Sequence, residues 1–404
     1  MKKRLFSILK RIMLMGLGVI FALGIAEVGL RIMGISFPIF DQPHPLLGRE
    51  NIPGVCGWQT NEGRAYVQIN SQGLRDCEHE IEKPDNCVRV AVLGDSYAEA
   101  FQVSLEESFP KVLERSLNEH SPEGGNRFEV INFGTSGYGT TQELIMLREE
   151  VWKYSPDIVV LAILTGNDII DNSREIRPGP TPYYILGDDG ELVLDKSFLD
   201  SQWYKSRMKM KRLGVHKLIN SSALAQLAVN CRAKIVSRKQ KQVFGTWDEP
   251  GLATEVYSEP KIKAWKDAWT VTEKVLLAVR KEVEVHGARL LVVTLSNGIQ
   301  VYPDAKVREQ FKKKIGSNDL FYPDRRIEKF CKHEGIEVLV LAPRLREYAE
   351  KNNLPLHGFE NTRLGTGHWN ANGQRLAGEY MAEKVEALVQ RLETAQRDDE
   401  KKAL

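Results

Sequence analysis

Four short segments of this 404-residue sequence carry groups that together suit acyl transfer. A serine hydroxyl attacks an ester carbonyl when a base such as histidine takes its proton. Backbone N–H groups and an asparagine amide then hold the negative charge that forms on the carbonyl oxygen. We therefore predict Ser96 as the nucleophile and His368 as the base, with oxyanion-hole donors on the loops that carry the other segments. The segments are Gly94-Asp95-Ser96, Gly134-Thr135-Ser136-Gly137, Gly166-Asn167-Asp168 and Gly367-His368.

Each segment has an ordinary explanation when it is taken alone. A Gly-Asp-Ser tripeptide is common, and a single histidine is more often a packing or surface residue. A glycine-rich loop after a strand can also bind phosphate, but residues 134–139 lack the phosphate-loop spacing and no Lys-Ser or Lys-Thr pair follows. The order of the segments favours acyl transfer, because one follows each of three successive predicted strands and the histidine precedes the last predicted helix.

An alternation of apolar runs and amphipathic stretches must position these segments. Apolar, β-branched runs predict buried strands, and helical spacing predicts helices between and after them. Strands of this kind that alternate with helices predict a parallel sheet covered on both faces, in a three-layer α/β/α domain with function at the carboxyl ends of the strands. The predicted strands are 89–93, 128–133, 156–163, 289–295 and 336–341, and the principal helices are 107–118, 140–153 and 372–394.

The first 35 residues differ in composition from the rest. Five basic residues among the first eleven precede an apolar stretch over 12–30 that only Glu27 interrupts. A helix of about 20 residues spans the hydrocarbon core of a membrane. The basic cluster predicts a cytoplasmic N-terminus, so residues 1–35 are expected to be a cytoplasmic tail and a single transmembrane signal-anchor. The alternative is a signal peptide that is cleaved after Ala26.

The remaining chain divides by composition. Residues 36–85 are expected to form a linker and an irregular N-terminal lobe, 86–396 a catalytic domain with a helical insertion at about 172–258, and 397–404 a charged tail. The stretch 201–247 has no acidic residue. It indicates either a solvated helical cap or a surface for anionic head groups or an acidic polysaccharide. Its basic residues include Lys205, Arg207, Lys209, Lys211, Arg212, Arg238, Lys239 and Lys241.

Overall composition limits the partners. The formal net charge is +2, and no basic block interleaved with aromatic residues is present, so nucleic acid is not an expected partner. Among five cysteines, Cys56, Cys77 and Cys87 supply either one disulfide in an exported protein or only free thiols. No Cys/His spacing indicates zinc, and no metal or organic cofactor is implied.

The four segments resemble the blocks that define SGNH, or GDSL-type, hydrolases. Residues 92–96 are similar to the nucleophile block, 130–137 to the glycine block with Gly137 at the oxyanion position, 165–168 to the asparagine block, and His368 to the histidine block. The resemblance covers roughly 86–175 and 287–390. It implies a flavodoxin-like α/β/α fold with a five-stranded sheet, an ester-cleaving activity, and an oxyanion hole formed by Ser96, Gly137 and Asn167.

Within that family the chain resembles bacterial membrane-anchored members, including the alginate O-acetyltransferase group. Residues 27–31, 70–75 and His368-Trp369-Asn370 carry this likeness. It implies a periplasmic serine esterase, fixed in the inner membrane, that acts on acetyl or other O-acyl esters of a polysaccharide, with polysaccharide export or synthesis proteins as partners. The alternatives are an O-acetyltransferase that uses the same residues, a non-catalytic glycan-binding subunit of an export machine, and a lipid-processing enzyme.

One departure from the family pattern concerns the acid of the triad. The family places an aspartate two or three residues before the histidine, where this sequence has Thr366 and Gly365. We therefore expect a Ser–His dyad whose ring is held by a backbone carbonyl or by the Thr366 hydroxyl, with Glu360 as an alternative acid. Asp95 and Asp168 are expected to brace the loops, although Asp168 could instead contact substrate.

Overall fold

The computed structural model describes residues 2–121, 125–241 and 252–403. Side chains are described for residues 4–121, 125–235 and 252–391. The side chains of Arg238, Lys239 and Lys241 and of the predicted charged tail 397–404 therefore lie outside the described residues. All five cysteines are free thiols, which is the second of the two alternatives for them.

The centre of the molecule is a parallel five-stranded sheet in the order β11-β10-β7-β5-β6. All five strands were predicted from their apolar runs. The middle strand β7 is buried along its whole length, as a strand covered on both faces must be. The strands are β5 (Cys87–Gly94), β6 (Arg127–Asn132), β7 (Ile158–Ile163), β10 (Arg289–Thr294) and β11 (Glu337–Val340).

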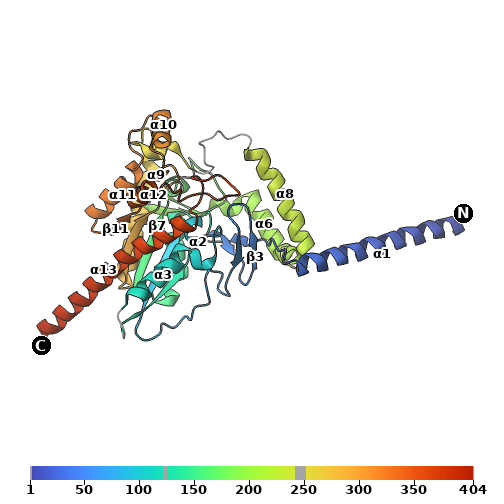
Figure 1. Cartoon of the computed structure of the whole chain (residues 1–404), viewed down its shortest axis with the longest axis horizontal. Helices are drawn as coiled ribbons and strands as arrows, with labels where there is room; N and C mark the ends of the chain where they lie inside the picture. Colours follow the sequence, from blue (N-terminus) through green and yellow to red (C-terminus); the bar gives the residue numbers. More distant parts are fainter. Residues whose placement is uncertain (1, 122–124, 242–251, 404) are drawn as a thin grey trace.

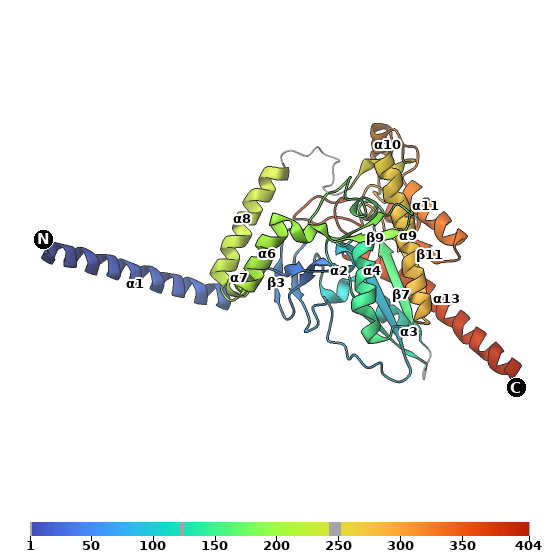
Figure 2. The same cartoon turned by 180° about the vertical axis from the view of Figure 1, so that it is seen from behind.

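Helices cover both faces of the sheet, so the three-layer α/β/α prediction is confirmed (Figures 1 and 2). Side chains alternate between the faces along each strand: in β5, Ala91 and Leu93 belong to one core, and Val90 and Val92 to the other. The first core is covered by α4 (Thr140–Glu149), α9 (Lys263–Val285) and α11 (Tyr322–His333), and the second by α3 (Phe109–His120), α12 (Ala342–Asn352) and α13 (Ala371–Ala403).

The strand order creates a switch point between β5 and β7. The chain leaves β5 towards β6 on one side, and then crosses to β7 on the other side of β5. Gly94 at the end of β5 is paired in register with Ala162 of β7. The loops after these two strands therefore start side by side and diverge, which is where open α/β sheets bind ligands.

The N-terminal lobe is more regular than we predicted. Two antiparallel ribbons form it, β1 (Asp41–His44) with β2 (Gly48–Asn51) and β3 (Cys56–Gln59) with β4 (Ala65–Gln68). Four-residue strands are too short to show a periodic pattern. The insertion likewise begins with a hairpin, β8 (Tyr183–Leu186) and β9 (Leu192–Asp195), before its predicted helices α6 (Gln202–Arg212), α7 (Val215–Asn220) and α8 (Ala223–Lys241).

Shorter elements complete the domain. Helix α10 (Ala305–Ile315) lies at the top of the domain, above α9, in both views (Figures 1 and 2). Single turns of 3₁₀ helix occur at Leu105–Glu107, Val151–Tyr154, Ser197–Asp200 and Thr254–Tyr257.

The N-terminal helix α1 (Lys2–Ile32) stands away from the rest of the molecule (Figures 1 and 2). Its segment Arg4–Ile32 contains an 18-residue window with a mean hydropathy of 2.1, and none of that window is buried in protein. By length and composition it can cross a membrane, and a signal sequence has the same properties.

Candidate active site

Ser96 lies on the tight turn that joins β5 to the short helix α2 (Ser96–Glu99). Asp95 caps this helix, since its carboxylate accepts the backbone N–H of Tyr97 at 2.8 Å. Gly94 allows the close packing, because a Cβ there would lie 3.0 Å from the Ala98 side chain. Every residue from 89 to 103 except Ser96 is buried. The turn therefore leaves Ser96 as the accessible residue of this segment.

A chain of hydrogen bonds runs from Ser96 to a glutamate. Nε2 of His368 lies 2.8 Å from Ser96 Oγ, and its Nδ1 lies 2.5 Å from Oε2 of Glu62. The other oxygen of Glu62 accepts the backbone N–H of His368 at 2.8 Å. When Nδ1 donates to Glu62, Nε2 is free to accept the proton of the Ser96 hydroxyl. This is the geometry of a nucleophile, a base and an orienting acid.

The charge state of Glu62 suits an orienting acid. Partial burial raises the pKa of Glu62, but hydrogen bonds from the ring and backbone of His368 and the charge of that ring outweigh burial. The pKa of Glu62 therefore lies below its ordinary value of 4.5. Glu62 is thus ionised at neutral pH, where it stabilises the imidazolium that forms when His368 takes a proton.

Glu62 reaches the site from the turn between β3 and β4. Gly63 follows it with a φ of +67°, and a Cβ at Gly63 would lie 2.3 Å from the carbonyl oxygen of Gln102. Asn361 clamps the turn, because its side-chain oxygen accepts the Gly63 N–H at 2.9 Å and its amide donates to the Gly63 carbonyl at 2.8 Å. The ribbon turn is therefore fixed to the loop that leads to His368.

The backbone before His368 is also held in place. The hydroxyl of Tyr97 donates to the carbonyl of Gly367 at 2.9 Å, and His357 Nδ1 donates to the same oxygen at 2.7 Å. Burial lowers the pKa of His357 to about 4, so this ring is neutral and keeps one N–H donor. Gly367 has a φ of +79°, and a Cβ there would lie 2.1 Å from Glu62.

The structure corrects our expectation for the support of the histidine ring. The Thr366 hydroxyl donates to the carbonyl of Arg363 at 3.0 Å. Glu360 is exposed, and the carboxylate that lies against the ring is that of Glu62. The expectation of a Ser–His dyad without an acid is also wrong, because the carboxylate of Glu62 accepts the hydrogen bond from His368 Nδ1. No spacing rule pointed to Glu62, because it lies 306 residues before His368.

The predicted oxyanion donors lie on the loops that follow β6 and β7. Asn167 caps the short helix α5 (Asp168–Asp171) and is partly exposed. One hydrogen of its amide is donated to Asp95 at 3.0 Å, which fixes the amide and leaves a second hydrogen. Gly137 is exposed with a φ of +79°, a conformation that favours glycine.

The glycine loop is fastened to the nucleophile turn. The backbone N–H of Thr135 donates to the Gly94 carbonyl at 3.0 Å, and the Ser136 N–H donates to the buried carboxylate of Glu99 at 3.1 Å. A Cβ at Gly134 would lie 2.4 Å from the Ala98 side chain, so only glycine allows this approach. The loops that carry Ser96 and Gly137 therefore form one rigid unit.

Buried carboxyl groups support these loops from below. Burial raises the pKa of Asp95, and burial together with the charge of Glu143 raises the pKa of Asp168 well above its ordinary value. Asp168 accepts the backbone N–H of Leu164 at 2.7 Å and is fully buried. Asp95 thus caps α2 and holds the side-chain amide of Asn167, and Asp168 holds the loop backbone at Leu164. Direct contact of Asp168 with substrate is excluded by its burial.

One cluster has the composition of a metal site but holds an ammonium group instead. Asp76, Cys77 and His79 bring their ligand atoms within 4.8 Å of one another. The Lys111 ammonium lies 2.7 Å from Asp76 and 3.4 Å from the Cys77 sulfur. Hydrogen bonds that its ring donates to the carboxylates of Asp76 and Glu129 outweigh burial and raise the pKa of His79 to about 10, so the ring is protonated and cannot bind a metal.

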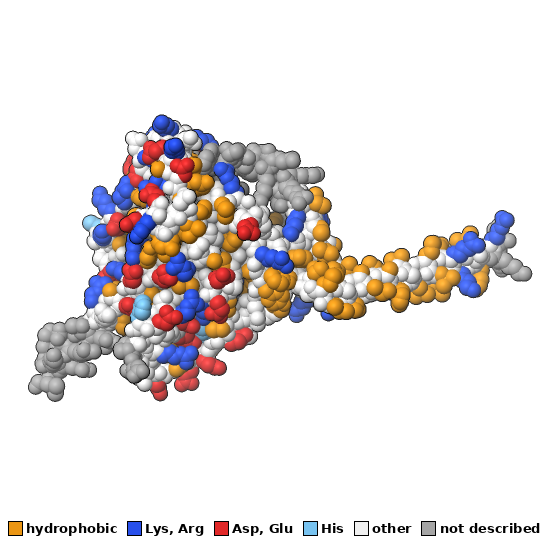
Figure 3. Space-filling model, in the orientation of Figure 1, with side chains coloured by type: hydrophobic (Ala, Val, Ile, Leu, Met, Phe, Trp, Pro, Cys, Tyr) orange, Lys and Arg blue, Asp and Glu red, His pale blue; other side chains and the backbone are white. Residues whose placement is uncertain are grey.

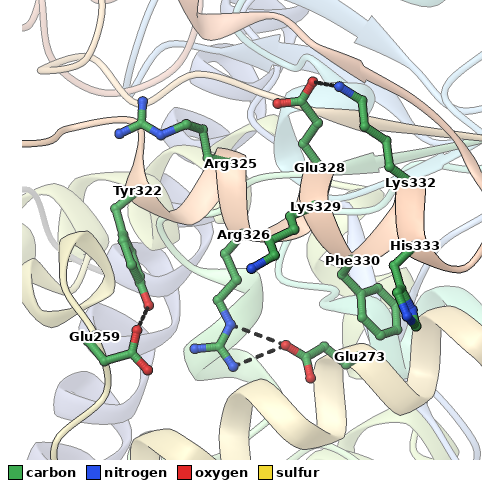
Figure 4. A pocket seen from close by; sticks show the side chains of 10 residues that line it. All are labelled: Glu259, Glu273, Tyr322, Arg325, Arg326, Glu328, Lys329, Phe330, Lys332 and His333. Carbon is green, nitrogen blue, oxygen red and sulfur yellow. Dashed lines mark hydrogen bonds and ion pairs between the residues drawn. The ribbon is translucent and has the colours of Figure 1, made fainter.

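A cavity of about 860 Å³ lies apart from Ser96, between α9 and α11 (Figure 4). Several of its polar groups pair with one another: Arg326 donates to Glu273 at 3.0 Å, and the Tyr322 hydroxyl donates to Glu259 at 2.6 Å. None of the predicted site residues lines it. The cavity therefore takes no part in chemistry at Ser96.

Comparisons with known proteins show partial and distant likenesses, and they assign no activity to the chain. No family model matches the chain. An arylesterase of Vibrio mimicus is 35% identical over 80 residues, which are 20% of this chain and 38% of that relative. The match thus spans well under half of the relative's length.

Several solved structures are similar at low identity. An acetylxylan esterase from Geobacillus stearothermophilus is 12% identical with a TM-score of 0.36, over 74% of this chain and 94% of that chain. A G-D-S-L family lipolytic protein from Desulfitobacterium hafniense, described as putative, is 13% identical with a TM-score of 0.32, over 73% and 98% of the two chains. The site's own geometry must therefore carry the functional argument.

Proposed function

We propose that this chain is a membrane-anchored serine esterase of the SGNH type that cleaves O-acyl esters, mainly acetyl esters, of an extracytoplasmic polysaccharide. The single observation that carries the proposal is the chain of contacts Ser96–His368–Glu62, at 2.8 and 2.5 Å. A serine, a histidine and a carboxylate in this order form the triad of acyl-transfer enzymes on several unrelated folds.

The first half of the reaction forms an acyl-enzyme. His368 Nε2 takes the proton of Ser96 while Oγ bonds to the ester carbonyl carbon, and Glu62 stabilises the resulting imidazolium. The negative charge on the carbonyl oxygen is held by the backbone N–H groups of Ser96 and Gly137 and by the second amide hydrogen of Asn167. The ester C–O bond then breaks, and His368 returns its proton to the departing sugar alkoxide.

The second half repeats these steps with a different nucleophile. Water gives a proton to His368 as its oxygen bonds to the acyl carbon. The bond to Ser96 Oγ then breaks, His368 returns the proton to that oxygen, and a carboxylic acid is released. A sugar hydroxyl in place of water makes the same machinery an O-acetyltransferase. The difference between hydrolysis and transfer therefore depends on access of water and acceptor, not on the triad.

Replacement of Asn167 by alanine is expected to lower kcat about 10²- to 10³-fold and to change KM little. The reason is that one donor is lost from a charge that exists only in the transition state. Kinetics with p-nitrophenyl acetate measure both constants. Asn352→Ala, which changes an exposed asparagine of α12, is the matched control. A raised KM with an unchanged kcat would instead place Asn167 in ground-state binding.

For the location, we propose that α1 is an uncleaved anchor in the bacterial inner membrane, with the N-terminus in the cytoplasm and the catalytic domain in the periplasm. Two observations support an anchor over a cleaved signal peptide. The segment Gly24-Ile25-Ala26 lies inside the continuous helix α1. The next turn of that helix carries Glu27, which accepts two backbone N–H groups at the start of α8.

Release of acetate from an acetylated polysaccharide tests the proposed activity. The full chain in detergent is expected to release acetate at a rate that Ser96→Ala removes. Acetate that appears on added bare glycan instead would establish the O-acetyltransferase. Absence of both, with no reaction of Ser96 towards a fluorophosphonate probe, would leave the non-catalytic glycan-binding subunit. That alternative rested on the missing aspartate and on the large basic insertion, and in this proposal Glu62 takes the place of the aspartate. Partners in polysaccharide export or synthesis belong to the same proposal.

A further inference from the structure

Helices α6 and α7 and the described part of α8 form a segment that we name the basic collar. It has no acidic residue between positions 201 and 235. Some of its basic residues pair with acids of neighbouring segments: Lys205 with Asp200, Arg207 with Asp41, and Lys211 with Glu50. Four others are exposed and form no ion pair within the described part of the chain, namely Lys209, Arg212, Lys217 and Arg232.

The basic collar also exposes large apolar side chains. Leu213 is 69% exposed, Leu218 71% and Ile235 59%. Figure 3 shows hydrophobic side chains gathered where α1 joins the domain and along α8. Exposed apolar groups next to unpaired basic groups are the composition of surfaces that lie in a membrane interface.

Contacts with α1 fix the position of the basic collar relative to the membrane surface. Glu27 accepts the N–H groups of Ala223 at 2.9 Å and Leu224 at 3.0 Å, and the Arg31 guanidinium donates to the carbonyl of Ser221 at 2.5 Å. The apolar stretch of α1 over residues 12–30 has a length of about 28 Å at 1.5 Å per residue, close to the ~30 Å hydrocarbon core. The turn between α7 and α8 therefore lies where α1 leaves the membrane.

The direction of α8 is the third observation. In both views α8 runs from the end of α1 across the direction of that helix instead of continuing along it (Figures 1 and 2). A helix that leaves the anchor in this way extends along the membrane surface when α1 spans the bilayer.

The geometry points to the basic collar as a binding surface for anionic phospholipid head groups around the anchor, with Leu213 and Leu218 in the acyl boundary. This inference rests on the proposed membrane anchor and not on the esterase chemistry. Lys209, Arg212 and Lys217 would contact lipid phosphates, since Lys and Arg near an anionic surface attract it. A second contact besides α1 would hold the catalytic domain in one orientation on the membrane.

Hydrogen exchange of the full chain in lipid nanodiscs tests this surface. Amides of residues 202–235 are expected to exchange roughly tenfold more slowly in phosphatidylglycerol than in phosphatidylcholine discs. Salt at 1 M should remove the difference, because the Debye length falls to about 3 Å. The triple variant K209E/R212E/K217E should also lose this difference in exchange between the two lipids. The matched control K306E/K313E/K351E makes the same change in net charge on α10 and α12, and it should keep the difference in exchange.

Three results would overturn the inference. Exchange that is the same in both lipids, or slower exchange that survives the collar variant, would exclude anionic lipid as the partner. Protection that appears in phosphatidylcholine discs only after an acidic polysaccharide is added would assign the surface to the polymer. Hydrolysis of p-nitrophenyl acetate is measured in the same samples. It tests the proposed esterase activity separately, because an inactive chain can still show lipid-dependent protection.

Discussion

Glu62→Gln is expected to lower kcat for p-nitrophenyl acetate about 10⁴-fold, the scale of loss when the acid of a triad becomes an amide. A glutamine cannot stabilise the imidazolium form of His368. Its amide also allows the opposite ring tautomer, in which Nε2 carries the proton and cannot accept that of Ser96. Steady-state kinetics on the purified full chain, with circular dichroism to confirm folding, measure this effect.

Glu360→Gln is the matched control for that experiment. It makes the same chemical change at the position that the sequence analysis named as an alternative acid, but Glu360 is exposed, whereas Glu62 lies 2.5 Å from His368 Nδ1. We expect an unchanged kcat. Comparable losses in both variants, or a loss only for Glu360→Gln, would show that the ribbon turn does not supply the acid.

Ser96→Ala is expected to have the largest effect, about 10⁶-fold in kcat, because no acyl-enzyme can form without the hydroxyl. The fold should be retained, since Ser96 is partly exposed and its described contact is with His368. Turnover of p-nitrophenyl acetate and covalent labelling by a fluorophosphonate are the two measurements. A purified variant with wild-type turnover would remove Ser96 as the nucleophile.

A second serine–histidine pair provides an internal control for the labelling. The Ser296 hydroxyl lies 3.0 Å from His357 Nε2 and also accepts the indole N–H of Trp369 at 2.8 Å. Ser296 and His357 are completely buried, so a probe in solution cannot reach them. Peptide mapping should therefore find the label on Ser96 alone in the wild-type chain, and His368→Ala should slow that labelling.

The central fold was predictable because its signals are local. Strands buried on both faces need continuous apolar runs, and residues 89–93 and 156–163 show them without reference to the rest of the chain. The ribbons β1–β2 and β3–β4 were missed, because strands of four residues carry too short a pattern. Their pairing is decided by contact with the domain they cover.

Some residues of the candidate site were likewise predictable from local patterns, and one was not. Ser96, Gly137 and Asn167 each follow a strand of one parallel sheet, and such strands end at a common edge. Their convergence follows from the sheet, and His368 is marked by its place before the last helix. Glu62 has no such signal, because it stands on a surface turn of a lobe that we expected to be irregular. The acid that seemed to be missing is supplied by a segment outside the region of family resemblance.

The sequence alone therefore predicted the sheet, the proposed nucleophile and base, and an apolar N-terminal helix, since each depends on residues close together in the chain. Only the tertiary structure decided which carboxylate faces His368, and where the basic insertion lies relative to α1. Both depend on contacts across long separations, 306 residues between Glu62 and His368 and 196 between Glu27 and Ala223. Contacts at such distances are set by packing of whole elements, which no local pattern of residue types records.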